Sequence, residues 1–228
     1  MVISFKGAHF PQSVILYAVF FYVRYAVSYR DLQEIMAERG VSVDHATLNR
    51  WVVKYSPLLA AQAQISKRPT SKSWRVDETY IKVNGRWHYL YRAVDRNGKT
   101  LDFMPFRHRN LSAARRFFKR IITSNRVPER VAIDKRGANL EGLRAVNAGL
   151  KFIGQDSLIE IRQSKYLNNI VEQDHRFIKR IARPMLGFKA FYSAAATLAG
   201  IEAAHMIRKN QIADTATSPF EIFASLAA

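Results

Sequence analysis

The chain has 228 residues, of which 48% are hydrophobic, and its 36 lysines and arginines outnumber its 18 acids to give a formal net charge of +18. This length and apolar content argue against global disorder, and the absence of cysteine excludes disulfides and thiolate metal sites. So large a basic excess predicts a polyanionic partner, with nucleic acid ahead of a membrane surface. The excess is greatest in residues 74–150, which carry +10 against +5 in residues 1–73 and +3 in residues 151–228.

The longest apolar run of the chain, Val14–Val27, is too short to span a bilayer and contains Arg24. It also lacks the basic flank and the cleavage pattern of a signal peptide. The six histidines are scattered without the spacing of metal ligands. We therefore expect no membrane contact and a cytoplasmic, DNA-associated location.

Residues 1–62 are expected to form a helical domain. An apolar and aromatic segment predicts a buried helix at Ser13–Val27, and a second helix is capped by Ser28 and ends at Gly40. Asp44 is placed to cap a third helix, His45–Tyr55. Two short helices joined by a turn that contains glycine match the helix-turn-helix pattern, in which the second helix reads DNA.

An ordinary helical hairpin has the same pattern, and the net charge is what favours DNA binding. The outward face of the helix at 45–55 carries side chains of the types that contact base edges and phosphates. They are His45, Thr47, Asn49, Arg50 and Lys54.

Residues 63–73 are polar and basic and contain Pro69, which predicts a linker before a second domain at residues 74–212. β-Branched and aromatic residues predict three antiparallel strands, with an Asn84-Gly85 turn between the first two. These strands are expected at 74–83, 86–95 and 99–106. Further along, we expect a basic helix at 111–124, a strand at 130–133, a helix at 139–148, a strand at 159–162 and a helix at 166–180. An Ala-rich packing helix at 188–210 would complete this domain, and residues 213–228 would form a tail.

This order of elements is that of an α/β ribonuclease-H-like fold, a mixed sheet flanked by helices. The fold brings together acids in the first strand, at the end of the fourth strand and on the late helix, which here are Asp77, Asp134 and Glu172. Convergent carboxylates suit Mg²⁺, and two such ions catalyse phosphoryl transfer. Each acid also has a plain structural alternative. Glu78 competes with Asp77 for the inward position, Asp134 could be a turn residue, and Asn169-x-x-Glu172 fits a capping box.

Six segments carry a family resemblance that covers nearly the whole chain. They are Phe5–Gly7, Ser28–Leu32, Trp74–Trp87, Asp134–Lys135, Lys165–His175 and Leu186–Lys189. In combination they resemble the DDE transposases of bacterial insertion sequences in family six. The resemblance implies a short transposase that binds double-stranded DNA at the terminal inverted repeats of its own element, acts as a homodimer or higher homo-oligomer, and forms cointegrates. It matches Asp77, Asp134 and Glu172 with the catalytic triad, and Lys179 with the basic residue associated with the triad.

We therefore expect Asp77, Asp134 and Glu172 to hold two Mg²⁺ ions, for which Mn²⁺ would substitute. Water activated at this site would cut a phosphodiester at an element end, and the freed 3′-hydroxyl would attack target DNA. Lys179 would position or neutralise the scissile phosphate.

Lys135 and Arg176 are expected to contact DNA as well. Three other functions stay open on sequence grounds: a non-catalytic DNA-binding regulator, an inactive transposase copy, and a ribonuclease-H-like nuclease. A regulator would leave three convergent acids in a basic protein without a purpose. The helix-turn-helix pattern argues against the nuclease.

Overall fold

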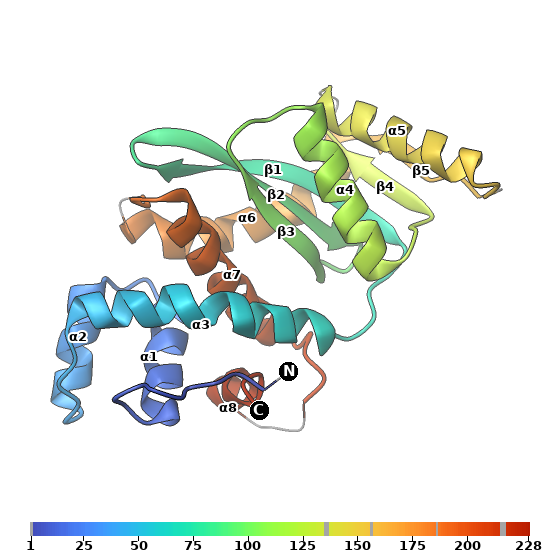
Figure 1. Ribbon diagram of the computed structural model, residues 1–228. Helices are drawn as coiled ribbons and strands as arrows, with labels where there is room; N and C mark the ends of the chain where they lie inside the picture. The colour runs from blue at the N-terminus through green and yellow to red at the C-terminus, as the bar shows by residue number, and fades with distance from the viewer. Residues whose placement is uncertain (1, 135–136, 156, 186, 215–217) are drawn as a thin grey trace. The chain divides into compact units, whose positions relative to one another are not determined.

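The computed structural model describes residues 2–134, 137–155, 157–185, 187–214 and 218–228 (Figure 1). The chain forms two compact units. One consists of residues 1–68 together with 178–228, and the other of residues 69–177. This division differs from the expected one, because the C-terminal helices group with the N-terminal helices and not with the sheet.

The first unit is helical. Its helices are α1 Gln12–Arg24, α2 Tyr29–Glu38, α3 His45–Ile65, α7 Phe191–Arg208 and α8 Pro219–Ser225. The predicted caps are confirmed. Ser28 and Asp31 form a capping box at α2, and Asp44 accepts hydrogen bonds from the first backbone N–H groups of α3. In the described ranges, no helix is both long enough and apolar enough to cross a membrane.

Helix α3 is longer than predicted, because it continues through Pro57 to Ile65. A proline inside a helix removes one backbone hydrogen bond and costs roughly 3 kcal/mol. The buried face that continues beyond it, with Leu59, Ala60 and Ala63, offsets this cost. The segment expected to begin a linker at residue 63 is therefore helical at its start.

Helix α7 was expected to pack in the same domain as the sheet, and this placement is wrong. It packs against α1 and α3, and Gly200 makes the close approach possible. A Cβ atom at Gly200 would lie 2.6 Å from Ser56 Oγ of α3 and from Val23 Cγ1 of α1. The small residues of α7 therefore serve helix–helix contact within the first unit.

The second unit is built on a five-stranded sheet. Its strands are β1 Ser73–Val83, β2 Arg86–Asp95, β3 Thr100–Phe106, β4 Arg130–Ile133 and β5 Glu160–Gln163. The strand order is β3-β2-β1-β4-β5, with β1–β3 antiparallel and β4 and β5 parallel to β1. Asn84 and Gly85 both have positive φ angles, as a two-residue hairpin turn of type I′ requires. This order and these directions confirm the predicted ribonuclease-H-like fold.

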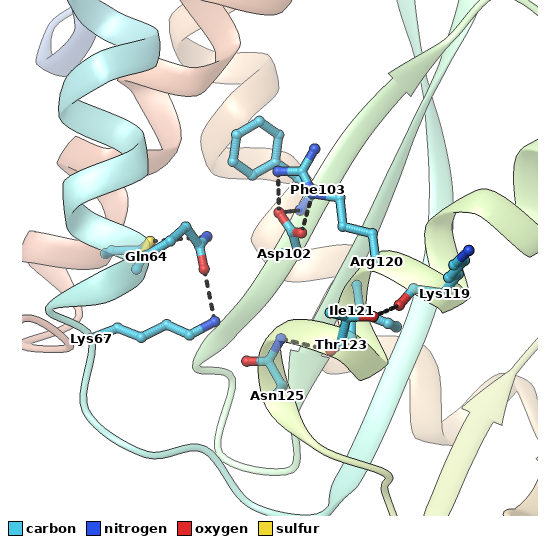
Figure 2. A network of polar contacts seen from close by, with 10 residues as sticks. Gln64, Lys67, Asp102, Phe103, Lys119, Arg120, Ile121, Thr123 and Asn125 are labelled. Carbon is cyan, nitrogen blue, oxygen red and sulfur yellow. Dashed lines mark hydrogen bonds and ion pairs between the residues drawn. The ribbon is translucent and has the colours of Figure 1, made fainter.

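Helices cover both faces of this sheet. They are α4 Leu111–Asn125, α5 Ala138–Phe152 and the first part of α6 Asn169–Ala182, which follows the short 3₁₀ helix η1 Lys165–Asn168. The end of α6 and the 3₁₀ helix η2 Arg183–Met185 belong to the first unit. α4 and α5 cover the face that carries the main apolar core, and α6 covers the opposite face (Figure 1). Figure 2 shows the ion pair between Arg120 of α4 and Asp102 of β3. The distance between Arg120 Nε and Asp102 Oδ2 is 2.6 Å.

Candidate active site

The alternation of side chains along β1 separates its two acids. Trp74 and Val76 belong to the apolar core under α4 and α5, and Glu78 points to the same face. Glu78 is paired there with Arg109, whose Nε lies 2.9 Å from Glu78 Oε1. Asp77 points to the opposite face and is half-buried. The neighbouring carboxylates therefore have different surroundings, and Glu78 already has a cationic partner.

Asp77 and Asp134 are level on adjacent parallel strands. The pairing of β1 with β4 includes Arg75 and Ala132, and each acid lies two residues further along its strand direction. Neighbouring strands are ~4.8 Å apart, so the backbones of the two acids lie close together on the same sheet face. Asp134 directly follows the last residue of β4.

Glu172 lies in the first turn of α6 and is exposed. The capping-box alternative for this acid is wrong, because Asn169 has helical backbone angles, φ −53° and ψ −34°. An N-cap residue has extended angles instead. The 3₁₀ helix η1 leads directly into α6, so Asn169 is already part of a continuous helical segment.

The three acids influence one another electrostatically. Burial, followed by the negative charge of Glu78 and then those of Glu172 and Asp134, raises the pKa of Asp77 from 3.8 to about 7. Among the described residues, no three His, Asp or Glu side chains lie close enough to hold one ion as they stand. Asp77, Asp134 and Glu172 thus belong to the same unit but do not form a closed metal cage as they stand. Their oxygen donors and their excess negative charge fit a hard divalent cation, which would relieve that charge.

The buried side of α6 differs from the predicted side. The apolar period of this helix predicts an inward arc of Ile170, Phe177, Ile178 and Ile181 and an outward arc that includes His175. The last three residues of the inward arc are buried, but Ile170 is 37% exposed and His175 is only 4% exposed. The buried residues are Val171, Asp174, His175, Phe177, Ile178 and Ile181. This set follows the helical period, but two of its members are polar, so an apolar pattern does not reveal it.

The two polar members both face the sheet next to Asp77. Asp174 Oδ2 lies 2.6 Å from Arg92 Nη2, and both side chains are buried. Arg92 is the direct cross-strand neighbour of Asp77. His175 Nδ1 lies 3.7 Å from Asp77 Oδ2. Neither contact was predicted from the sequence. The one sign of them was the acid Asp174, which lies at a helical position on the apolar side.

The other predicted residues of this region lie outside that cluster. Arg176 and Lys179 are exposed on α6. Lys179 follows Glu172 by seven residues, which corresponds to ~10 Å along the helix and nearly the same side. The division between the two units falls within α6, after Phe177, so Lys179 belongs to the first unit. Lys135 lies outside the described residues.

Known proteins have sequences similar to this chain. Residues 71–211 match the sequence family of IS240-type transposases described as a DDE domain. The transposase for insertion sequence-like element IS431mec of Staphylococcus aureus is 41% identical over 209 residues, which cover 90% of this chain and 88% of that protein. The transposase for IS257 in transposon Tn4003, also from Staphylococcus aureus, has the same identity and coverage. The chain belongs to the DDE transposases of insertion-sequence family six.

Solved structures similar to this transposase include retroviral integrase cores. The HTLV-2 integrase catalytic core domain in complex with magnesium has a TM-score of 0.45 and 16% identity, over 58% of this chain and 83% of that chain. The BIV integrase catalytic core domain has a TM-score of 0.44 and 19% identity, over 68% of this chain and 95% of that chain. As a DDE transposase, the protein is a polynucleotidyl transferase, and its family uses divalent metal ions.

The N-terminal unit of the transposase presents part of the predicted DNA-reading face. His45, Arg50 and Lys54 are exposed on α3. Arg50 Nη2 donates a hydrogen bond of 2.7 Å to Thr47 Oγ1. Lys54 Nζ lies 4.9 Å from the centre of the Tyr55 ring. These three side chains are therefore exposed to solvent on one helix.

The other two residues of that predicted face have contacts within the unit. Thr47 Oγ1 donates a hydrogen bond of 2.6 Å to Asp44 Oδ2. The side chain of Asn49 hydrogen-bonds the side chain of Tyr29. Both residues are only half-exposed. They therefore help to fix α3 in its unit, which leaves less of each side chain for a ligand.

Proposed function

We propose that this transposase cuts DNA at the terminal inverted repeats of its element and joins the freed 3′-hydroxyl to target DNA, with Asp77, Asp134 and Glu172 as the metal-binding carboxylates. The observation that carries this proposal is the placement of the acids, with Asp77 and Asp134 level on adjacent parallel strands and Glu172 in the first turn of α6. Acids that repel one another on a basic protein are stabilised by bound cations. Mg²⁺ is the proposed ion, two per site, with Mn²⁺ as a substitute.

When bound, such a pair of ions polarises the phosphate and stabilises both the attacking and the leaving oxygen. The residues of the chain supply the framework for this chemistry. Asp77 and Asp134 are fixed by adjacent strands, and Glu172 is fixed by α6. Buried His175 lies beside Asp77, with 3.7 Å between Nδ1 and Oδ2, and helps to fix that carboxylate against α6. Lys179 is proposed to neutralise the scissile phosphate.

The reaction consists of two in-line displacements. In the first, water attacks the phosphorus at the element end and the bond to the 3′ oxygen breaks, which leaves a 3′-hydroxyl on the element and a 5′-phosphate on the flanking DNA. In the second, this 3′-hydroxyl attacks a phosphodiester of target DNA. A new phosphodiester forms, and the target strand leaves as a 3′-hydroxyl.

Selection of the ends is assigned to residues 1–62, through His45, Arg50 and Lys54, with smaller contributions from Thr47 and Asn49 (all five are on α3). Catalysis is assigned to the sheet unit, residues 69–177, since α7 and α8 group with the N-terminal helices. Arg176 and Lys135 are proposed as phosphate contacts. Paired ends require at least two copies of the chain, so a homodimer or higher homo-oligomer is the proposed active form.

The test is cleavage and joining of labelled element-end DNA with Mg²⁺. We expect the wild type to cut and join, and Asp134→Ala to do neither. Glu172→Gln should still bind the ends but should not cut them. Binding without any metal-dependent strand transfer by the wild type would instead identify a regulator. Cutting at positions unrelated to the element ends would identify a nuclease.

A further inference from the structure

A basic pocket lies on the sheet of the second unit, one row of residues before the acids. Arg75 of β1 is level with Ala132 of β4, which is level with Arg162 of β5. Both arginines therefore share a sheet face with Asp77 and Asp134. The pocket has a volume of about 270 Å³. Its other cationic lining residues are Lys72, Arg96 and Arg130.

The acids around this pocket balance only part of its charge. Glu160 Oε1 lies 2.6 Å from Arg162 Nε, and Glu160 Oε2 lies 3.5 Å from Arg130 Nε. Glu129 lies 3.4 Å from Lys72 Nζ. Buried Asp95 also acts on Arg75, but its oxygens accept backbone N–H groups of the adjacent turn and of Ser71. Five cations thus face three carboxylates.

The guanidinium of Arg75 is only partly satisfied by the protein. Its Nη1 donates to Ser73 Oγ and to the carbonyl of Trp74, both at 3.0 Å. Its Nε is buried and has no acceptor among the described residues. Arg162 and Arg130 line the same pocket, so their positive charges and that of Arg75 repel one another. An anion in the pocket would relieve this repulsion and accept from Nε.

The distance from this pocket to the acids suits a DNA backbone. A strand rises ~3.3 Å per residue, so Arg75 and Asp77 are ~7 Å apart along β1. Phosphates of one DNA strand follow one another at ~3.4 Å along the helix axis. If the scissile phosphate lies at the acids, a phosphate one or two nucleotides away lies at the pocket.

We propose that Arg75, Arg96 and Arg162 bind a backbone phosphate that flanks the scissile phosphate and hold the cut strand in register. This inference rests on the proposed function, because it takes the acids as the place of cutting. Guanidinium groups suit the task, since their planar donors bind phosphate oxygens in pairs. A backbone contact of this kind positions the DNA and reads no sequence.

The first test measures binding of element-end DNA in EDTA, by fluorescence anisotropy over a range of salt concentrations. Arg162→Gln and Arg75→Gln should each weaken binding several-fold and lower the slope of log affinity against log salt by about 1. The matched control is Arg144→Gln on α5, because Arg144 also pairs with one exposed glutamate, Glu141. Equal losses in Arg144→Gln and Arg162→Gln would overturn the proposal. Arg162 is about half-exposed, so Arg162→Gln should fold and still tests the proposal if Arg75→Gln does not fold.

The second test replaces single phosphates near the cut by neutral methylphosphonates. In the wild type, one substitution within two nucleotides of the cut should weaken binding, and in Arg162→Gln the same substitution should have a much smaller effect. An equal penalty in both proteins at every position would overturn the proposal. Millimolar inorganic phosphate is then added. If it removes the difference between the two proteins without releasing the DNA, the proposal is also overturned, because the pocket would then bind free phosphate. All binding is measured without metal. Absence of cleavage in Mg²⁺ would therefore count against the proposed function alone.

Discussion

Arg92 and Asp174 form a buried ion pair between the sheet and α6, with 2.6 Å between Nη2 and Oδ2. Arg92 is the cross-strand neighbour of Asp77, and Asp174 follows Glu172 by two residues. The pair therefore connects the strand that carries one candidate catalytic acid with the helix that carries another. The pair thus helps to fix the position of Glu172 relative to Asp77.

Removal of one partner of this pair should strongly destabilise the fold. Asp174→Ala leaves a buried guanidinium without its carboxylate, and the expected loss in the free energy of unfolding is about 3–5 kcal/mol. Urea unfolding measures it. The double variant Arg92→Leu/Asp174→Leu should lose less than the single variant, because neither charge remains buried. Arg144→Gln, which breaks an exposed pair, should cost no more than about 1 kcal/mol. A loss in Asp174→Ala as small as this control would contradict a structural role.

The pKa of Asp77 predicts how stability changes with pH in the absence of metal. Burial and nearby acids raise this pKa from 3.8 to about 7 on folding. Between about pH 4 and pH 7 the folded state holds a proton that the unfolded state has lost, so stability falls as pH rises. The stability that protonated Asp77 contributes is fully present below about pH 4 and is lost above about pH 7. Asp77→Asn should remove this dependence. Urea unfolding at about pH 5 and about pH 8 measures the difference, and parallel pH profiles for the two proteins would refute it.

The stabilisation of the fold by a divalent metal ion should increase with pH, whereas the stabilisation by the proton on Asp77 decreases. A cation competes with the proton on Asp77, so the rise in Tm caused by Mn²⁺ should grow as the pH increases through about 7. Differential scanning fluorimetry in Mn²⁺ and in EDTA gives this shift at each pH. We expect little or no shift for Asp77→Asn. A shift of equal size in wild type and variant would place the ion elsewhere.

Recognition by α3 should depend on its exposed cations. Arg50→Ala and Lys54→Ala should each weaken binding of end DNA and lower the salt slope by about 1 if each contacts a phosphate. Thr47→Ala should mainly affect stability, because Thr47 bonds Asp44 and Arg50 within the unit. Anisotropy and thermal melts separate the two effects. Unchanged DNA affinity in the double variant Arg50→Ala/Lys54→Ala would exclude α3 as the recognition helix.

Lys179 should affect the rate of cutting more than the affinity for DNA. Loss of a charge at the scissile phosphate costs on the order of tenfold to several hundredfold in rate. Lys179→Ala should show such a loss in single-turnover cleavage, and Lys179→Arg should recover part of it. Lys151→Ala, which removes an exposed lysine from the last turn of α5, is the control. Equal rates for the Lys179 and Lys151 variants would remove Lys179 from the site.

The sheet could be predicted from the sequence because its signals are local. Alternating β-branched and aromatic residues defined β1 and β2, and Asn84-Gly85 defined the turn between them. The order of elements then gave the fold. The candidate acids followed from their places in that fold, the family resemblance matched them with the catalytic triad, and the structure has them on β1, after β4 and on α6.

The features that the sequence did not reveal depend on tertiary contacts. The buried side of α6 contains Asp174 and His175, whose partners Arg92 and Asp77 are distant in the chain. α3 continues past Pro57 because its later residues are buried. An apolar pattern identifies a buried face only when that face is apolar, and it does not name the element that covers it.

The most direct test of the central claim, that Asp77, Asp134 and Glu172 together hold the metal, is Mn²⁺ titration of the transposase bound to element-end DNA, followed by electron paramagnetic resonance. We predict that the wild type binds Mn²⁺ and cuts the DNA. Asp77→Asn, Asp134→Asn and Glu172→Gln should each lose bound Mn²⁺ and cleavage together, whereas Arg144→Gln should keep both. If any one of the three acid variants retained full Mn²⁺ occupancy and wild-type cleavage, that acid would not belong to the site and the account would be contradicted.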